Sequence, residues 1–202
     1  MRADAAVQIF EEVGAIRHGH FELTSGLHSG TYVQCALVLQ YPKYAEQLGR
    51  ALAAEFMDLR VDCVASPALG GLIIGHEVAR AIPPRHDGKP MRAIFVERDS
   101  LGTLTLRRGF RVEPDEHILV VEDVWTTGGS TCETIRVLEE AGARVVAAGA
   151  LIDRSGGKIE LPVRTEALVE LKIENYDASE CPLCRSGDVA VKPGSRYAKL
   201  GV

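Results

Sequence analysis

Four short apolar runs, separated by longer segments with helical spacing, constrain the fold of this chain more than any other feature. The runs cover residues 61–67, 91–98, 117–124 and 144–154. Runs of this length that alternate with helices are typical of buried strands in a parallel sheet. Residues 166–171 are predicted to add a fifth strand. The sequence therefore predicts an α/β fold with a central, mostly parallel sheet flanked by helices.

Two helices can be placed from the spacing of their apolar side chains. Val7, Phe10 and Val13 share one face of a predicted N-terminal helix. Pro42 is predicted to open a second helix, because proline is well tolerated in a first helical turn. Apolar side chains then recur every four residues, at Tyr44, Leu48, Leu52 and Phe56.

Length and charge limit the classes of protein that fit this chain. Its 202 residues suit one domain with a real core. The formal net charge of -5 gives no general attraction to nucleic acid or to an anionic membrane. No apolar stretch reaches the roughly 18 residues of a membrane span, and the N-terminus lacks a signal-peptide core. With five cysteines, an odd number, the expectation is reduced thiols in a cytoplasmic protein.

The most informative local pattern lies where the third run ends. Glu122 and Asp123 close the run, and residues 125–130 are predicted to form a strand-to-helix loop. In open α/β folds that edge of the sheet binds ligands. The glycines Gly128 and Gly129 let successive N–H groups point at one anion. The pattern favours a site in which carboxylates bind sugar hydroxyls and loop amides bind a phosphate.

Other interpretations of this loop were weighed. Ser130 and Glu133 have the spacing of a capping box, so the loop could be a simple capped turn. No lysine follows the glycines as in a Walker A loop, and the third glycine of a dinucleotide fingerprint is absent. Trp125 could pack beneath the loop or flank a base.

The stretch VVEDVWTTGGS, residues 120–130, resembles the signature of the type I phosphoribosyltransferases. Three further segments narrow the resemblance to the orotate phosphoribosyltransferases. Residues 19–34 resemble their N-terminal hood, residues 65–75 their pyrophosphate loop, and residues 149–154 the strand whose closing arginine grips orotate. Residues 181–187 resemble the tail of a bacterial subgroup of these enzymes.

The resemblance implies a single type I phosphoribosyltransferase domain over residues 1–202, with a small hood from about 1–40 plus the C-terminal segment and a core over about 41–175. It implies transfer of ribose 5-phosphate from 5-phosphoribosyl 1-pyrophosphate (PRPP) to orotate, in pyrimidine biosynthesis. Mg2+ is the expected cofactor, held mainly through substrate and water. A homodimer is expected, because the resembling enzymes complete each site with a partner loop.

The resemblance also assigns roles to residues. Asp123 and Arg98 are the expected catalytic residues, with Glu122 and Asp123 at the ribose hydroxyls. The expected PRPP-binding set is Ala68, Leu69, Gly70, Gly71, Arg98, Glu122, Asp123, Val124, Trp125, Thr126, Thr127, Gly128, Gly129 and Ser130. The expected orotate-binding set is Thr24, Tyr32, Thr126 and Arg154, of which Arg154 could instead pair with Asp153 or another acid on the rim.

The chain departs from the family at its basic residues. The usual mobile loop carries lysines and a histidine, but residues 96–110 contain neither. Arg98 is the best match to the missing charge, and Arg107 and Arg108 could add to it; each could also belong to a solvated loop. Thr24 and Gly70 stand where many members have lysine.

These departures leave two further functions open. One is a phosphoribosyltransferase for a purine or another base, because the PRPP signature is shared. The other is a regulator that senses PRPP without catalysis. The acidic balance and the short N-terminus argue against a DNA-binding regulator.

A second group of residues has a less certain role. Cys181 and Cys184 have a C-x2-C spacing, which predicts a structural turn, a redox-labile pair or a metal half-site completed across a dimer. His18, His20 and His28 fit no standard metal motif by spacing, so polar surface histidines are expected.

Overall fold

The fold is described by a computed structural model, which covers residues 1–23, 25–84 and 88–193. The expectation for Thr24 lies outside the described residues. One sheet has six strands in the order β5-β4-β3-β6-β7-β8. Their bounds are β3 Cys63–Pro67, β4 Arg92–Arg98, β5 Leu104–Leu106, β6 His117–Trp125, β7 Arg144–Asp153 and β8 Arg164–Glu170.

The mostly parallel sheet predicted from the sequence is confirmed. All five predicted strands form, and they pair with one another in parallel. The sixth strand, β5, pairs antiparallel with β4 and was not predicted. Its three residues are too few for an alternating pattern to be recognised.

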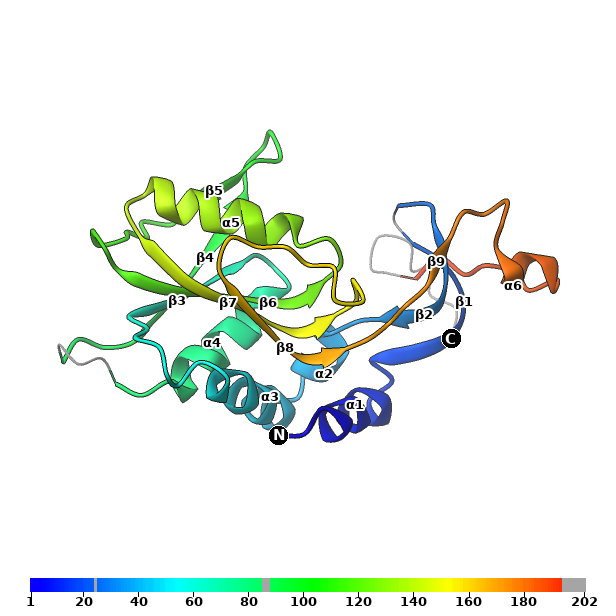
Figure 1. The fold of residues 1–202 in the computed structure, drawn as a ribbon, viewed down its shortest axis with the longest axis horizontal. Helices are drawn as coiled ribbons and strands as arrows, with labels where there is room; N and C mark the ends of the chain where they lie inside the picture. The colour runs from blue at the N-terminus through cyan, green and yellow to red at the C-terminus, as the bar shows by residue number, and fades with distance from the viewer. Residues whose placement is uncertain (24, 85–87, 194–202) are drawn as a thin grey trace.

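Helices cover both faces of this sheet (Figure 1). On one face lie α1 (Ala3–Glu12), α2 (Ala36–Leu39), α3 (Pro42–Ala54) and α4 (Gly71–Ala81), and on the other lies α5 (Gly129–Glu140). Strand β6 shows why both faces of the sheet must be covered by helices. Leu119 and Val121 pack with the first group of helices, whereas Ile118 and Val120 pack with α5. Successive side chains of a strand point to opposite faces, so a continuous apolar run requires cover on both. In the described part of the chain, no helix is long and apolar enough to cross a membrane.

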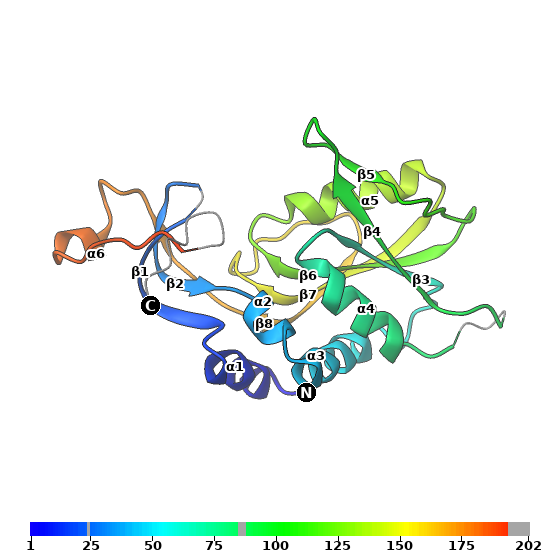
Figure 2. The same cartoon turned by 180° about the vertical axis from the view of Figure 1, so that it is seen from behind.

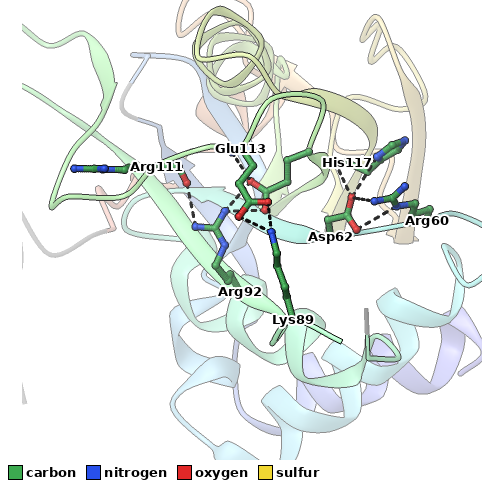
Figure 3. A network of polar contacts seen from close by, with 8 residues as sticks. Arg60, Asp62, Lys89, Arg92, Arg111, Glu113 and His117 are labelled. Atoms are coloured by element: carbon green, nitrogen blue, oxygen red, sulfur yellow. Dashed lines mark hydrogen bonds and ion pairs between the residues drawn. The ribbon is translucent and has the colours of Figure 1, made fainter. Parts of the chain in front are cut away.

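The amino ends of the strands are held by buried carboxylates (Figure 3). Arg92 at the start of β4 donates from Nη2 to both oxygens of Glu116, at 2.7 and 2.6 Å. Asp62 accepts from Arg60 at 3.2 Å and from the backbone N–H of His117 at 3.1 Å. These contacts join the amino ends of β3, β4 and β6 by ion pairs and hydrogen bonds.

A second, smaller sheet joins the two ends of the chain. It contains β1 (Ile16–Glu22), β2 (His28–Val33) and β9 (Asn175–Tyr176), and we call it the hood sheet. Figure 2 shows it standing to one side of the main sheet, with α6 (Pro182–Arg185) at its outer end. Val191 bridges to Phe21, which places the C-terminal segment beside β1.

Candidate active site

The two loops singled out in the sequence meet at the carboxyl edge of the main sheet. Strands β3 and β6 are neighbours, although β4 and β5 separate them in the chain. The connections after β3 and β6 therefore run in opposite directions, and this reversal opens a crevice between the loops that follow the two strands. Residues 68–70 follow β3 and residues 126–128 follow β6.

Glycines 70 and 71 allow the first loop to approach the second. A Cβ added at Gly70 would lie 2.5 Å from Oδ1 of Asp123, and one added at Gly71 would lie 2.9 Å from the carbonyl oxygen of Val121. Any side chain at position 70 would therefore displace Asp123. This contact gives a physical reason for glycine where many members of the resembling family have lysine. The Ala68–Leu69 peptide bond is cis, and Leu69 is exposed.

The second loop has the form expected of an anion-binding turn. Gly128 has φ of 73°, a conformation that favours glycine, and α5 starts at Gly129. Thr126 and Thr127 are exposed at the tip. The strand reaches Trp125, so the loop is shorter than the predicted 125–130. Backbone N–H groups of the first turn of α5 lie at its mouth, where a helix favours negative charge.

The capping box suggested by the spacing of Ser130 and Glu133 does not form. Gly128 is the residue before α5, and no side chain caps the helix. Glu133 turns away to the neighbouring hairpin, where it accepts from the N–H of Leu104 at 3.0 Å and from Arg98 at 3.2 Å. Ser130 is thus not engaged with Glu133 in a cap.

A buried chain of hydrogen bonds holds Glu122. Trp125 packs beneath the loop, where its indole N–H donates to Oγ1 of Thr131 at 2.9 Å. The hydroxyl of Thr131 donates in turn to the carboxylate of Glu122. The side chain of Trp125 therefore acts as a support for the acidic pair, and the indole does not flank a base.

Burial raises the pKa of both acids. It raises the pKa of Glu122 to about 7, with a further increase from the charge of Asp123 and a decrease from the Thr131 hydrogen bond. Burial also raises the pKa of Asp123, against hydrogen bonds from backbone N–H groups. Two carboxyls side by side in low dielectric favour partners that donate hydrogen bonds. Ribose hydroxyls are such partners.

We predict that Glu122→Gln stabilises the unliganded protein at pH 8 but not at pH 4. A carboxyl whose pKa is raised on folding keeps its proton more strongly when folded, so its contribution to stability is lost as pH rises from about 4.5 to about 7. The shift corresponds to roughly 3 kcal/mol of unfolding free energy, or a melting temperature several degrees higher for the variant at pH 8. Calorimetry across this range provides the measurement. An equal effect of the substitution at every pH would contradict the assignment.

Arg154 directly follows β7, on the other side of the loop after β6. Its backbone N–H donates to the carbonyl of Trp125 at 2.8 Å. Within the described residues, Nε and Nη2 of its guanidinium are buried without a hydrogen-bond partner. The proposed ion pair with Asp153 is wrong, because that carboxylate instead accepts from the N–H of Ser155 at 2.7 Å. Burial lowers the pKa of Arg154, while Tyr32 and Cys35 nearby oppose this effect.

Arg154 also lines a cavity of about 830 Å3 between the core and the hood sheet. This volume suits a small-molecule ligand. Side chains that line the cavity include Thr126, Thr127, Arg154, Lys158, Lys172 and Tyr176. The cavity therefore brings together the tip of the loop after β6, three cationic residues and two residues of the hood sheet, Asn175 and Tyr176.

The arginines Arg98, which ends β4, and Arg107 and Arg108, which follow β5, do not line this cavity. Arg98 donates to the carbonyl of Gly102 and to Glu133 in the first half of α5. Arg108 forms a two-pronged pair with Glu97 at 2.9 Å, and Arg107 lies 3.7 Å from the same carboxylate. All three are about half exposed. The expected solvated loop is in fact a hairpin whose arginines are ion-paired.

Several residues of the site were not recognised in the sequence. Thr131 supports Glu122, and Cys35 donates from its buried thiol to the carbonyl of Asp123 at 3.6 Å. Lys158 and Lys172 contribute charge to the cavity. Of these residues, only Thr131 could have been recognised from the sequence, because it follows the glycine loop directly. The others come from segments without a motif.

Comparison with known proteins decides the family. Residues 38–166 match the model of the phosphoribosyl transferase domain. An orotate phosphoribosyltransferase from Pelotomaculum thermopropionicum is 50% identical over 196 residues, which are 97% of this chain and 99% of that protein. The chain belongs to the orotate phosphoribosyltransferase family. The family's enzyme from Thermotoga maritima is 46% identical over 192 residues, covering 95% of this chain and 98% of its own length.

Solved structures of phosphoribosyltransferases share the fold. The orotate phosphoribosyltransferase of Mycobacterium tuberculosis, solved with PRPP, has a TM-score of 0.63 at 22% identity, covering 82% of this chain and 96% of that one. The adenine phosphoribosyltransferase of Thermoanaerobacter pseudethanolicus has a TM-score of 0.56 at 16% identity, covering 70% of this chain and 88% of that one. Because a purine enzyme has the same fold, the fold does not select the base.

Proposed function

We propose that the protein transfers the ribose 5-phosphate group of PRPP to orotate, giving orotidine 5'-monophosphate and pyrophosphate. The observation that carries the proposal is the guanidinium of Arg154, buried without a partner at a cavity that also contains the phosphate loop. Buried cationic donors without partners are costly, so a ligand that supplies an anion is strongly favoured there. Orotate has a carboxylate, whereas adenine, hypoxanthine and xanthine do not.

The proposed chemistry divides between the two loops. We assign the 5'-phosphate to residues 126–130 and the ribose hydroxyls to Glu122 and Asp123. The bond between C1 and the pyrophosphate breaks through a cation-like ribosyl transition state, and the negative potential of Asp123 stabilises that charge. Gly70 and Gly71 bring backbone groups of the first loop close enough to hold the pyrophosphate. Arg154, with Tyr32 and Thr126, orients orotate so that its ring nitrogen faces C1.

Mg2+ completes the proposed site. Carboxylate oxygens at Glu122 and Asp123 suit this hard cation, but they form no cage of protein ligands. Among the described residues, the cluster of metal-binding type lies in the hood and not here. The ion would therefore be held mainly by substrate oxygens and water, and would neutralise charge on the pyrophosphate.

The direct test follows loss of orotate absorbance with purified protein. We expect turnover that requires both PRPP and Mg2+, is lost when either is omitted and returns when it is restored. Formation of one pyrophosphate per orotate consumed gives an independent measure. If PRPP binds while orotate is not consumed, the PRPP-sensing alternative takes the place of the enzyme.

Arg98→Ala is predicted to lower kcat/KM by about tenfold, because we assign Arg98 to the charge of the leaving pyrophosphate. Its surface ion pair with Glu133 contributes little, so the melting temperature should change only slightly. Arg107→Ala is the matched control, since Arg107 lies in the same hairpin and only 3.7 Å from an acid. Full turnover in Arg98→Ala would remove Arg98 from the catalytic set.

We further propose a cytoplasmic homodimer in which the hairpin after β4 reaches the partner's site. Leu101 at the tip of that hairpin is 89% exposed, which suits a contact with another subunit. Mixing Arg98→Ala with Asp123→Asn tests this arrangement, because a mixed dimer would regain one intact site. Sedimentation as a monomer, with no recovery on mixing, would contradict it.

A further inference from the structure

Four side chains converge at the outer end of the hood, away from the cavity. His20 lies in β1, His28 begins β2, and Cys181 and Cys184 flank the start of α6 (Figure 1). Their ligand atoms all lie within 4.8 Å of one another. The two pairs are more than 150 residues apart in the chain, so only the fold brings them together.

The distances fit a tetrahedral ion. Nε2 of His20 lies 2.8 Å from Nδ1 of His28 and 3.5 Å from Sγ of Cys181. Sγ of Cys184 lies 3.3 Å from Nδ1 of His28 and 3.8 Å from Nε2 of His20. Zinc bonds of about 2.3 Å to sulfur and 2.0–2.1 Å to nitrogen give tetrahedral edges of about 3.3–3.8 Å. Three of the four separations match, and the two nitrogens need to part by about half an ångström.

A further contact sets the tautomer of one histidine. Nδ1 of His20 lies 3.0 Å from the carbonyl oxygen of Asp188, so it carries the proton and donates. Nε2 is then left with a lone pair that faces the cluster. Metal-bound histidines usually have such a partner on the other ring nitrogen, because it fixes the ring and raises its basicity.

Burial points to a structural site. Cys181 is fully buried, His20 and His28 are 7% and 8% exposed, and only Cys184 of the four is exposed. Four protein ligands leave no open position for a substrate, and two thiolates with two imidazoles favour zinc over Mg2+. From these contacts we infer that His20, His28, Cys181 and Cys184 bind one Zn2+ ion, which fastens the C-terminal segment to the hood sheet.

This site corrects two expectations. His20 and His28 are buried and convergent, whereas only His18 is the exposed histidine that was expected. A half-site completed across a dimer is not needed, since one chain supplies all four side chains. The spacing of these residues in the sequence could not predict the cluster, because the two histidines and the two cysteines belong to opposite ends of the chain.

The ion would stabilise the hood sheet, and the hood sheet forms part of the cavity wall. The hood sheet carries Tyr32 on β2 and Tyr176 on β9, and Tyr176 lines the cavity. The segment after α6 is also held to β1 by backbone bonds of Val191 with His20 and Glu22 and by the pair of Lys192 with Glu22. A four-ligand ion crosslinks these elements and stabilises the folded state by its binding free energy. The inference does not depend on the proposed reaction.

Metal analysis of the purified protein tests the inference, with the protein made without a histidine tag and dialysed against metal-free buffer. We expect about one zinc per chain by mass spectrometry. Cys184→Ser and His28→Gln should each lose most of the zinc and melt at a lower temperature. Cys132→Ser is the matched control, since Cys132 is an exposed cysteine on α5 and should leave the zinc content unchanged.

A second readout examines the ligands themselves. Replacing zinc with Co2+ should give the intense visible bands of a tetrahedral thiolate site in the wild type, and these should weaken in Cys184→Ser. Wild-type protein that holds no zinc and gives no such bands would overturn the inference, as would a Cys181–Cys184 disulfide in the freshly purified protein. Neither readout depends on activity, so failure here leaves the proposed reaction untouched.

Discussion

Asp123→Asn is expected to lower kcat/KM for phosphoribosyl transfer by about 10²–10³-fold, which is 3–4 kcal/mol of transition-state stabilisation. Asparagine has nearly the same shape, so the contact of Asp123 with Gly70 is preserved. What is lost is one negative charge beside a ribosyl group that becomes cation-like. Because both acids are half-buried, that charge is only partly screened by water and is worth more than it would be on the surface.

The stability of Asp123→Asn separates a catalytic loss from a structural one. Burial raises the pKa of Asp123, so the folded protein gains nothing from this charge without a ligand. The variant should melt at or slightly above the wild-type temperature at pH 8 while its turnover falls. Steady-state kinetics and calorimetry on the same preparation provide the measurement. A variant that keeps wild-type turnover would move the catalytic role away from this carboxylate.

Arg154→Gln is expected to reduce kcat/KM for orotate by about 10²-fold or more. The guanidinium of Arg154 has two buried N–H donors without a protein partner, and a bidentate pair with the orotate carboxylate would satisfy both. A ligand that loses such a pair leaves its carboxylate desolvated, so the cost exceeds that of one neutral hydrogen bond. The loss should fall on orotate affinity as well as on turnover.

Matched measurements make the Arg154 prediction specific. Binding of PRPP alone should change little in Arg154→Gln, because the phosphate loop and the acidic pair remain. Lys158→Gln, in an exposed residue of the same cavity, serves as the control and should have a much smaller effect. If Lys158→Gln abolished turnover while Arg154→Gln preserved it, the base would bind in another orientation.

The sequence contained enough information for the main sheet and for the position of the loop between β6 and α5. The strands are continuous apolar runs, and the loop between β6 and α5 has its residues adjacent in the chain. Local patterns of this kind can be recognised without a structure. The contact between Gly70 and Asp123 also follows from topology, since both lie at the carboxyl edge of neighbouring strands.

Other parts of the site depend on contacts between distant segments. Strand β5 has only three residues, and its pairing turns the region of Arg98 into a hairpin held by Glu133. The lysines of the cavity come from segments without a motif. The hood cluster needs His20 beside Cys181, and no spacing rule covers a separation of this length. Tertiary structure alone brings these groups together.

The most direct test of the central claim is a competition among bases. The protein is incubated with PRPP, Mg2+ and an equimolar mixture of orotate, adenine, hypoxanthine and xanthine, and the nucleotides formed are identified by mass spectrometry. Because Arg154 requires an anionic partner, the account predicts orotidine 5'-monophosphate as the nucleotide product. Formation of a purine nucleotide without orotidine 5'-monophosphate would contradict it.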